Sequence, residues 1–348
     1  MDPPIRRIPT DPPDESPERS IALCLSGGGY RAMLFHLGAL WRLNELGYLP
    51  QLDRVSSVSG GSITAAALAM NWAQLDFDAA GVSRGFHAAV VKPVRSLANH
   101  TIDVWAVLAG VLSLGTKGSH AASFFRRHLL GSTTLQDLPD RPRFVFNATS
   151  LQSGVLWRFT KTYMWDYRVG QIPYPSTSLA TAVAASAAFP PLLSPVLLHF
   201  HDSEYTPGTG VDLQKPPFTT RVVLTDGGVY DNLGLETAWK RCSTILVSDG
   251  GGRSNPEPSP MFNWFFQIYR LLMVIDAQVR SLRKRQTIGA FSSGQREGVY
   301  WGIGSHIADY GVPDALSCPS DQTARLAALA TRLRRVKPET QERLINWG

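Results

Sequence analysis

The chain has 348 residues, of which 44% are hydrophobic and 18% are charged, so it can bury a full core and is not an intrinsically disordered protein. Its three cysteines lie far apart and give neither a disulfide framework nor metal-ligand spacing, so we expect a reducing, cytoplasmic compartment. The net charge of +6 is moderate, and because no nucleic-acid-binding motif accompanies it we expect no nucleic-acid partner.

Residues 1–20 are rich in proline, aspartate, glutamate and arginine and contain no apolar stretch. We interpret them as a flexible tail and not as a signal peptide. Further along the chain no segment reaches the roughly 20 apolar residues that span a bilayer. Residues 104–114 come closest, and their length predicts a buried or interfacial helix.

From residue 21 onward, strand patterns alternate with helical ones. The predicted strands are 21–25, 54–58, 143–147, 155–162, 221–225, 244–248 and 299–303, and the predicted helices are 29–46, 62–75, 178–188 and 323–336. Residues 76–138 look mostly helical and irregular, and 202–218 look like a surface loop. The β-branched runs at 221–225 and 244–248 are typical of buried parallel strands. This alternation predicts an α/β domain around a mostly parallel sheet.

Two glycine-rich turns about thirty residues apart are the most informative feature. They read Ser-Gly-Gly-Gly-Tyr-Arg at 26–31 and Ser-Val-Ser-Gly-Gly-Ser at 57–62, and each follows a predicted strand and opens a predicted helix. Two such units side by side can direct an activated serine toward a cluster of backbone N–H groups. A serine acyl hydrolase requires at least these two features, a nucleophilic serine and donors for the oxyanion.

The second turn contains the candidate nucleophile, Ser59. It lies in a variant of the G-x-S-x-G elbow, in which a sharp turn between strand and helix exposes the serine at the positive end of the helix. Taken alone, the pattern also fits a serine that caps a helix.

The first turn then supplies the oxyanion hole, through the N–H groups of Gly27, Gly28 and Gly29. Two alternatives exist for it. One is an ordinary tight turn. The other is a dinucleotide fingerprint of the form G-x-G-x-x-A, with Asp53 about twenty residues further on. The dinucleotide interpretation leaves the second turn unexplained.

The serine requires a base, and the best candidate is Asp226. It ends a predicted strand, and open α/β sheets place their active sites at the carboxyl ends of strands. Asp249 ends the next strand in a similar sequence, and a triad Ser59, Asp226 and His306 would have the chain order of the α/β-hydrolases. Spacing alone does not separate Asp226 from Asp249.

Taken together, these motifs resemble those of the patatin-like phospholipases of bacterial type. That family has an oxyanion motif Gly-Gly-Gly-x-Arg/Lys, a G-x-S-x-G elbow and an Asp-Gly-Gly/Ala motif. They match residues 27–31, 57–61 and 226–228 in the same order, and residues 185–191 and 229–234 are also family-like. The resemblance covers 21–252 well. Ser57 departs from the first elbow glycine, and Ala32 departs from the last glycine of the usual oxyanion motif.

The resemblance implies a three-layer αβα fold, with 21–348 as the catalytic domain and about 256–348 as its helical extension. It implies a lipid acyl hydrolase in which Ser59 attacks the ester, Asp226 takes its proton, and the glycine N–H groups hold the oxyanion. It favours Asp226 over Asp249, and it implies no metal and no cofactor. Arg31 would either orient a substrate phosphate or brace the loop. Alternatives are a lysophospholipase or general esterase, an effector phospholipase activated by a partner or nucleotide, and a non-catalytic lipid-binding module.

A last segment, 261–285, bears on the membrane. Its first half is apolar and aromatic with one narrow polar stripe, and Arg280, Arg283, Lys284 and Arg285 follow. It predicts either a helix buried in the core or an interfacial helix or acyl-site lid whose basic end contacts lipid headgroups. The second interpretation predicts peripheral contact with the inner membrane surface.

Overall fold

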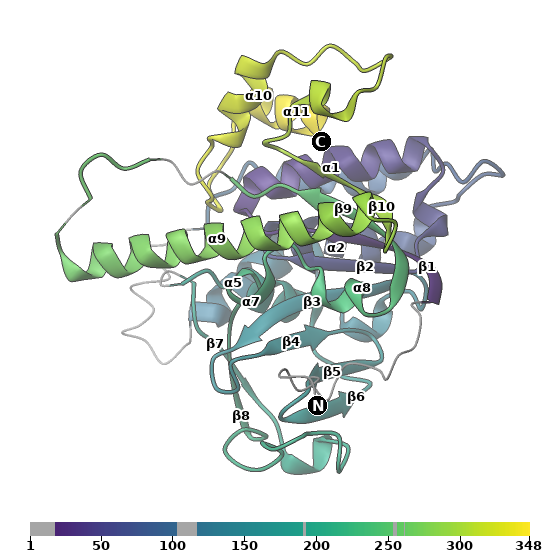
Figure 1. The fold of residues 1–348 in the computed structure, drawn as a ribbon. Coiled ribbons are helices and arrows are strands. Elements are labelled where there is room, and N and C mark those ends of the chain that lie inside the picture. The colour runs from purple at the N-terminus through teal and green to yellow at the C-terminus, as the bar shows by residue number, and fades with distance from the viewer. Residues whose placement is uncertain (1–17, 103–116, 191–192, 253–255, 261) are drawn as a thin grey trace, which may run out of the picture.

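The computed structural model describes residues 18–102, 117–190, 193–252, 256–260 and 262–348 (Figure 1). Its strands form one ten-stranded sheet. They are β1 Glu18–Leu25, β2 Arg54–Val58, β3 Arg143–Ser150, β4 Leu156–Phe159, β5 Tyr163–Asp166, β6 Gly170–Pro173, β7 Val196–His199, β8 Arg221–Asp226, β9 Cys242–Asp249 and β10 Glu297–Gly302.

The helices alternate with these strands. They are α1 Gly29–Glu45, α2 Gly60–Met70, α3 Lys92–Leu97, α5 Lys117–Phe125, α6 Leu179–Ser186, α7 Gly228–Asp231, α8 Glu236–Trp239, α9 Trp264–Ser292, α10 Ser320–Ala327 and α11 Pro338–Trp347. Short 3₁₀-helices lie at Leu49–Gln51, Trp72–Gln74, Leu135–Asp137, Asp202–Glu204 and Ile307–Tyr310. Short π-helices lie at His87–Val91 and Arg126–Leu130.

The sheet runs in the order β10-β9-β1-β2-β3-β4-β5-β6, and β8 pairs with both β3 and β7. The strands β10, β9, β1, β2 and β3 pair with one another in parallel. Beyond β3, the strands β4, β5 and β6 form an antiparallel meander. The predicted α/β class with a central, mostly parallel sheet is therefore confirmed. The prediction that 221–225 is a parallel strand is wrong, because β8 runs antiparallel to both of its partners.

Side chains of the central strands face two different cores. In β1, Leu23 and Leu25 join the larger core under α1, α2, α3, α5, α6 and α11, whereas Ala22 and Cys24 join a smaller one. The smaller core includes Leu233, Leu235 and Ala238 around α7 and α8, with Phe291 of α9 packed against it. Helices thus cover both faces of the sheet, and this gives the three predicted layers.

Several predicted boundaries shift. Strand β1 begins at Glu18, three residues before the predicted start of the strand at Ile21. The predicted helix at 323–336 is wrong beyond residue 327, because 329–332 run without helix across the start of α1 and the chain becomes helical again only at Pro338. The apolar segment 104–114 lies outside the described residues.

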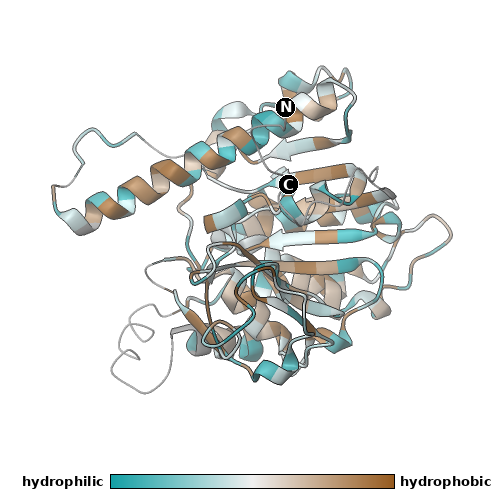
Figure 2. Ribbon diagram, turned by 60° about the horizontal axis from the view of Figure 1, so that its bottom comes forward, coloured by the Kyte–Doolittle hydropathy of each residue, from teal (hydrophilic) through white to brown (hydrophobic). Residues whose placement is uncertain are grey.

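Helix α9 is 29 residues long and extends beyond the core on the left of Figure 1. Its projecting part carries large apolar side chains that are exposed, and Figure 2 shows hydrophobic residues along it. They include Phe262 (just before the helix), Trp264, Phe266, Ile268, Leu271 and Ile275. In the part of the chain that is described, no helix is long and apolar enough to cross a membrane.

The basic end of α9 packs against the protein. Arg280 donates a hydrogen bond to the carbonyl of Gly252, Arg283 lies 3.3 Å from the carboxylate of Glu236, and the Lys284 ammonium lies 4.6 Å from the centre of the Tyr300 ring. The structure therefore contradicts the interpretation of 261–285 as a helix buried in the core, whereas its contact with a membrane stays a prediction. The apolar half is exposed and not buried in the core, and three of the four basic side chains hold the helix to the protein.

Candidate active site

The candidate site forms where two strands end on the same edge of β3. Residues 143–147 of β3 pair with β2, whose last residue, Val58, lies opposite Asn147. The next residue of β3, Ala148, pairs with Asp226, the last residue of β8. Because β4 occupies the other edge of β3 over Phe146–Thr149, β2 and β8 must share one edge and meet end to end. Ser59 follows β2 directly, so this topology brings Ser59 and Asp226 together.

Ser59 occupies a sharp turn. Its φ of 51° is one of two positive values among the non-glycine residues described, and such backbone strain concentrates at functional sites. The Ser59 N–H donates a 3.0 Å hydrogen bond to the side chain of Ser186. At Gly60 a β-carbon would lie 2.1 Å from the carbonyl oxygen of Gly29, so this glycine lets the two turns touch. Ser57 fits the first elbow position because that position is the extended end of β2.

The three glycines lie beside this turn. A β-carbon at Gly27 would lie 3.2 Å from the β-carbon of Ser59, so the loop borders the candidate nucleophile. The Gly27 N–H donates to the carbonyl of Asn232 at 3.0 Å. By contrast, the N–H groups of Gly28 and Gly29 have no hydrogen-bond partner within the described residues. They begin α1, where the helix dipole favours negative charge, so two free donors remain for an anion.

Asp226 is buried beside Ser59. Its Oδ1 accepts a 2.7 Å hydrogen bond from the Gly228 N–H, and its Oδ2 has no partner in the described part of the chain. Burial raises the pKa of Asp226 to about 7, against the opposing effects of the Gly228 N–H and the Ser59 hydroxyl, and the charge of Asp276 on α9 raises it further. A carboxyl group with this pKa can accept and return a proton near neutrality.

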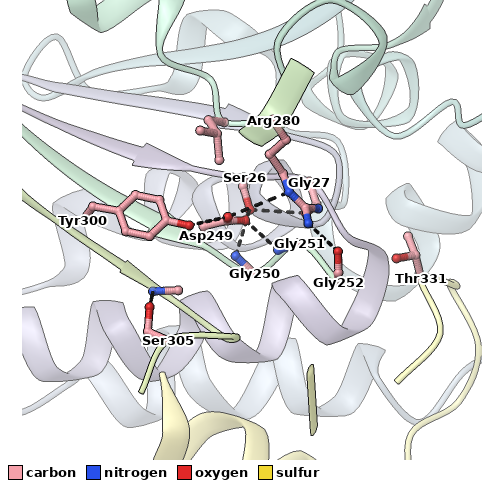
Figure 3. A network of polar contacts seen from close by, with 12 residues as sticks. Ser26, Gly27, Asp249, Gly250, Gly251, Gly252, Arg280, Tyr300, Ser305 and Thr331 are labelled. Atoms are coloured by element: carbon pink, nitrogen blue, oxygen red, sulfur yellow. Dashed lines mark hydrogen bonds and ion pairs between the residues drawn. The ribbon is translucent and has the colours of Figure 1, made fainter. Parts of the chain in front are cut away.

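Asp249, the alternative candidate for the base, is occupied by structural contacts (Figure 3). It accepts hydrogen bonds from Ser26 Oγ at 3.3 Å, from the Gly251 N–H at 2.9 Å and from the Tyr300 hydroxyl at 2.6 Å. Arg280 of α9 lies 4.0 Å away. Asp249 thus joins β9, β10, α9 and the glycine-rich loop, and its two oxygens are both taken.

The structure brings no histidine to Ser59 among the residues described. His306 is exposed, and no hydrogen bond joins it to Ser59 or Asp226. His36 is buried below the glycine-rich loop, where its ring nitrogens lie 2.9 Å from the Ser26 carbonyl and 2.8 Å from Ser248 Oγ. Burial lowers the pKa of His36 to about 4, so this histidine is neutral and supports the loop.

The dinucleotide interpretation does not fit the geometry. Asp53 immediately precedes β2, so it lies at the opposite end of that strand from the turns. Its Oδ2 accepts the N–H of Ile21, and Arg141 binds its Oδ1. The dinucleotide fold instead requires an acidic side chain at the carboxyl end of the strand, near the glycine turn.

Arg31 is buried and fully engaged. It donates to the carbonyls of Gly250 and Leu329 and to Thr331 Oγ1, and the Tyr30 N–H donates to the carbonyl of Arg332. A β-carbon at Gly29 would lie 2.7 Å from that same carbonyl oxygen. The segment 329–332 therefore lies directly on the glycine-rich loop. Burial is the main cause that lowers the pKa of Arg31 to about 10.

Sequence reasoning missed three residues around the site. Ser186 accepts the Ser59 N–H, and the Asn232 side chain fills the space beside Gly27 and Gly228. Asp276 comes from α9, about fifty residues after β8. The family-like segments 185–191 and 229–234 contained a signal for the first two, whereas nothing in the local sequence around Asp276 indicated proximity to Asp226. Within the described residues, no group of three or more His, Cys, Asp or Glu side chains is placed to hold a metal ion.

Comparisons with known proteins bear on the family and on the fold. The family model described as patatin-like phospholipase matches residues 23–239, and a comparison with curated proteins gave no match. Among solved structures, human GIVD cytosolic phospholipase A2 is similar, with a TM-score of 0.57 and 12% identity over 94% of this chain and 60% of that one. The same human enzyme in complex with methyl gamma-linolenyl fluorophosphonate gives a TM-score of 0.51 and 13% identity over 94% of this chain and 56% of that one.

The chain thus spans less than two thirds of the human protein, and at this identity the likeness concerns the fold. The family match covers more than half of the chain and includes all three motifs. The chain belongs to the patatin-like phospholipase family.

Proposed function

We propose that this protein cleaves fatty-acyl esters of phospholipids or other lipids through a Ser59–Asp226 dyad and an acyl-enzyme intermediate. The observation that carries the proposal is the position of Asp226. It is buried next to Ser59, one carboxyl oxygen has no partner in the described structure, and its pKa is raised to about 7. Such a carboxyl group has the basicity that an aspartate exposed to water lacks.

In the first half of the reaction, Asp226 removes the hydroxyl proton of Ser59 while the serine oxygen attacks the ester carbonyl. The N–H groups of Gly28 and Gly29, which have no other partner within the described residues, donate to the resulting oxyanion. The tetrahedral intermediate collapses, the acyl–oxygen bond breaks, and Asp226 returns the proton to the leaving alcohol.

In the second half, water replaces the alcohol. Asp226 takes one proton from the water molecule, and the resulting hydroxide attacks the acyl-enzyme carbonyl, whose oxygen lies in the same oxyanion hole. Collapse releases the fatty acid, and the proton goes back to Ser59. Each residue thus ends in its starting state, and no further proton acceptor is required.

For Arg31 we propose the bracing role. All three of its nitrogens donate to Gly250, Leu329 and Thr331, so a substrate phosphate would have to displace these contacts. The arginine then fixes segment 329–332 on the glycine-rich loop and holds the loop in shape.

We also propose that the projecting half of α9 docks on a lipid surface. Its exposed apolar side chains can enter the boundary between headgroups and acyl chains. The same helix places Asp276 close enough to Asp226 to raise its pKa, so the docking surface and the dyad are adjacent. Membrane contact through apolar side chains, not through the basic end, differs from the sequence-based interpretation.

The experiment compares the purified protein with Ser59→Ala on phospholipid vesicles and on a short, water-soluble ester. We expect the wild type to hydrolyse both and Ser59→Ala to hydrolyse neither, with His306→Ala as the matched active control. Hydrolysis of the soluble ester alone would favour a general esterase. Absence of wild-type activity on both substrates, restored by an added partner or nucleotide, would favour an activated effector.

A further inference from the structure

A polar cavity of about 420 Å³ lies at the end of the sheet opposite to Ser59. It is lined where β1, β2, β3 and β9 begin, by residues that include Arg19, Arg54, Arg143 and Cys242. Arg54 is the first residue of β2 and Val58 is the last, and at about 3.3 Å per residue the strand separates the cavity from the dyad by roughly 15 Å. The cavity is therefore distinct from the candidate active site.

The positive charge of this cavity is not balanced by the protein around it. Five arginines line it, together with two aspartates, Asp53 and Asp140. Both aspartates already have cationic partners, Asp53 in Arg141 and Asp140 in Lys161 at 3.0 Å. None of the other four arginines forms an ion pair with a carboxylate of the described residues; they are Arg19, Arg54, Arg143 and Arg241.

Among the arginines that line the cavity, Arg54 gives the strongest argument for a bound anion. Its side chain is only 8% exposed, it lines the cavity, and its Nε has no hydrogen-bond partner in the described structure. A buried donor without a partner is costly, and an anion bound in the cavity would supply the acceptor that the Arg54 guanidinium lacks. Half-buried Arg143 and exposed Arg19 and Arg241 surround the same space with planar donors that suit bidentate recognition of phosphate oxygens.

We infer that this cavity is a binding site for a phosphorylated small molecule, held by Arg54 at its floor and by Arg19, Arg143 and Arg241 around it. The volume exceeds that of a single phosphate and falls in the range of small-molecule sites. Strand β2 links the site to the Ser59 turn, but binding as such does not depend on the hydrolase activity. A phosphorylated nucleoside and a phosphorylated lipid headgroup offer the same chemistry, and the experiment distinguishes them.

The test titrates the full chain with inorganic pyrophosphate by calorimetry, at a constant ionic strength of about 0.15 M set with chloride. We expect saturable binding to one site with a Kd below about 1 mM. Arg54→Gln should weaken binding at least tenfold, because the buried donor is lost. Arg42→Gln, which changes an exposed arginine paired with Glu45 on α1, should bind as the wild type does. Unsaturable binding, or equal binding by Arg54→Gln and wild type, would overturn the inference.

Two further measurements keep the test decisive. Because the Arg54 side chain makes no hydrogen bond within the described residues, Arg54→Gln should keep the wild-type Tm without ligand and lose the rise in Tm that pyrophosphate causes. If that variant does not fold, Arg143→Gln and Arg241→Gln provide the same comparison, and unchanged binding in both would refute the site. Tighter binding of ATP than of pyrophosphate identifies a nucleotide ligand, and tighter binding of inositol trisphosphate identifies a headgroup.

Discussion

Ser59 and Asp226 are 167 positions apart in the sequence, and they meet because β2 and β8 end at consecutive residues of β3, Asn147 and Ala148. Neither strand alone makes a site. The parallel strand delivers the serine at its carboxyl end, and the antiparallel strand, arriving from the other direction, delivers the aspartate at its own carboxyl end. Because β8 runs opposite to β2, the carboxyl ends of the two strands face each other, and this brings Ser59 and Asp226 together.

The nucleophile is tested by two substitutions at position 59. Ser59→Ala should lower ester hydrolysis by about 10³-fold or more, because the attacking oxygen is gone. Ser59→Gly should be equally inactive but more stable than Ser59→Ala, by on the order of 1 kcal/mol, because the φ of 51° is strained for any residue with a β-carbon. Urea unfolding and ester kinetics measure the two effects separately. Equal stability of the two variants would remove the strain argument.

Asp226→Asn should stabilise the fold at alkaline pH while lowering activity about 10²–10⁴-fold. The pKa of Asp226 rises from its ordinary value of 3.8 to about 7 on folding, so its favourable contribution is complete below pH 3.8 and is lost as the pH rises through 7. The full loss corresponds to about 4 kcal/mol. The advantage of the asparagine variant should therefore grow from pH 4 to pH 8. An advantage that does not change with pH would contradict the raised pKa.

The pH dependence of catalysis should reveal the same group. Because Asp226 must be deprotonated to act as the base, kcat/KM on a neutral soluble ester should rise with pH and level off above a pKa of about 7. His306→Ala should leave the profile unchanged, since His306 lies exposed and away from the dyad. A profile that is already flat at pH 5 would mean that the base has an ordinary aspartate pKa.

The apolar half of α9 should control vesicle binding. Phe262, Leu271 and Ile275 are 95%, 59% and 58% exposed, and replacing all three by Gln should weaken vesicle binding by well over tenfold while leaving soluble-ester turnover unchanged. The matched control replaces Leu151, Val211 and Leu316 by Gln. These residues lie outside α9 and are 53%, 56% and 80% exposed. Co-sedimentation with vesicles decides; equal loss in both triple variants would indicate non-specific adhesion.

Arg31→Met separates the two roles considered for this arginine. If Arg31 braces the glycine-rich loop against Leu329 and Thr331, the variant should have a lower Tm and lose activity in parallel on a phospholipid and on an ester without phosphate. A loss confined to the phospholipid, at unchanged Tm, would instead show that Arg31 binds the substrate phosphate.

The two glycine-rich turns could be predicted from the sequence because tight turns leave local signatures. Gly28 and Gly29 have positive φ, and Gly60 touches the neighbouring backbone, so each requires glycine. The direction of β8 escaped prediction because a β-branched run reports burial on both faces and carries no information on which neighbour it will pair with.

Features that depend on tertiary contacts could not be predicted. The helix expected at 323–336 stops at Ala327 because the carbonyls of Leu329 and Arg332 bind Arg31 and the Tyr30 N–H. An apolar helix pattern does not distinguish core packing from exposure, so the projection of α9 was not foreseen. The arginines of the cavity come from separate segments of the chain, and no local charge run indicates them.

The central claim is that Asp226 activates Ser59. The most direct test is the rate at which a fluorophosphonate modifies the protein, with the modified residue identified by peptide mass spectrometry. The account predicts that only Ser59 is labelled, that labelling of the wild type accelerates as the pH rises through about 7, and that Asp226→Asn slows it at least 10²-fold at pH 8. Labelling of Asp226→Asn at the wild-type rate, or of a residue other than Ser59, would contradict it.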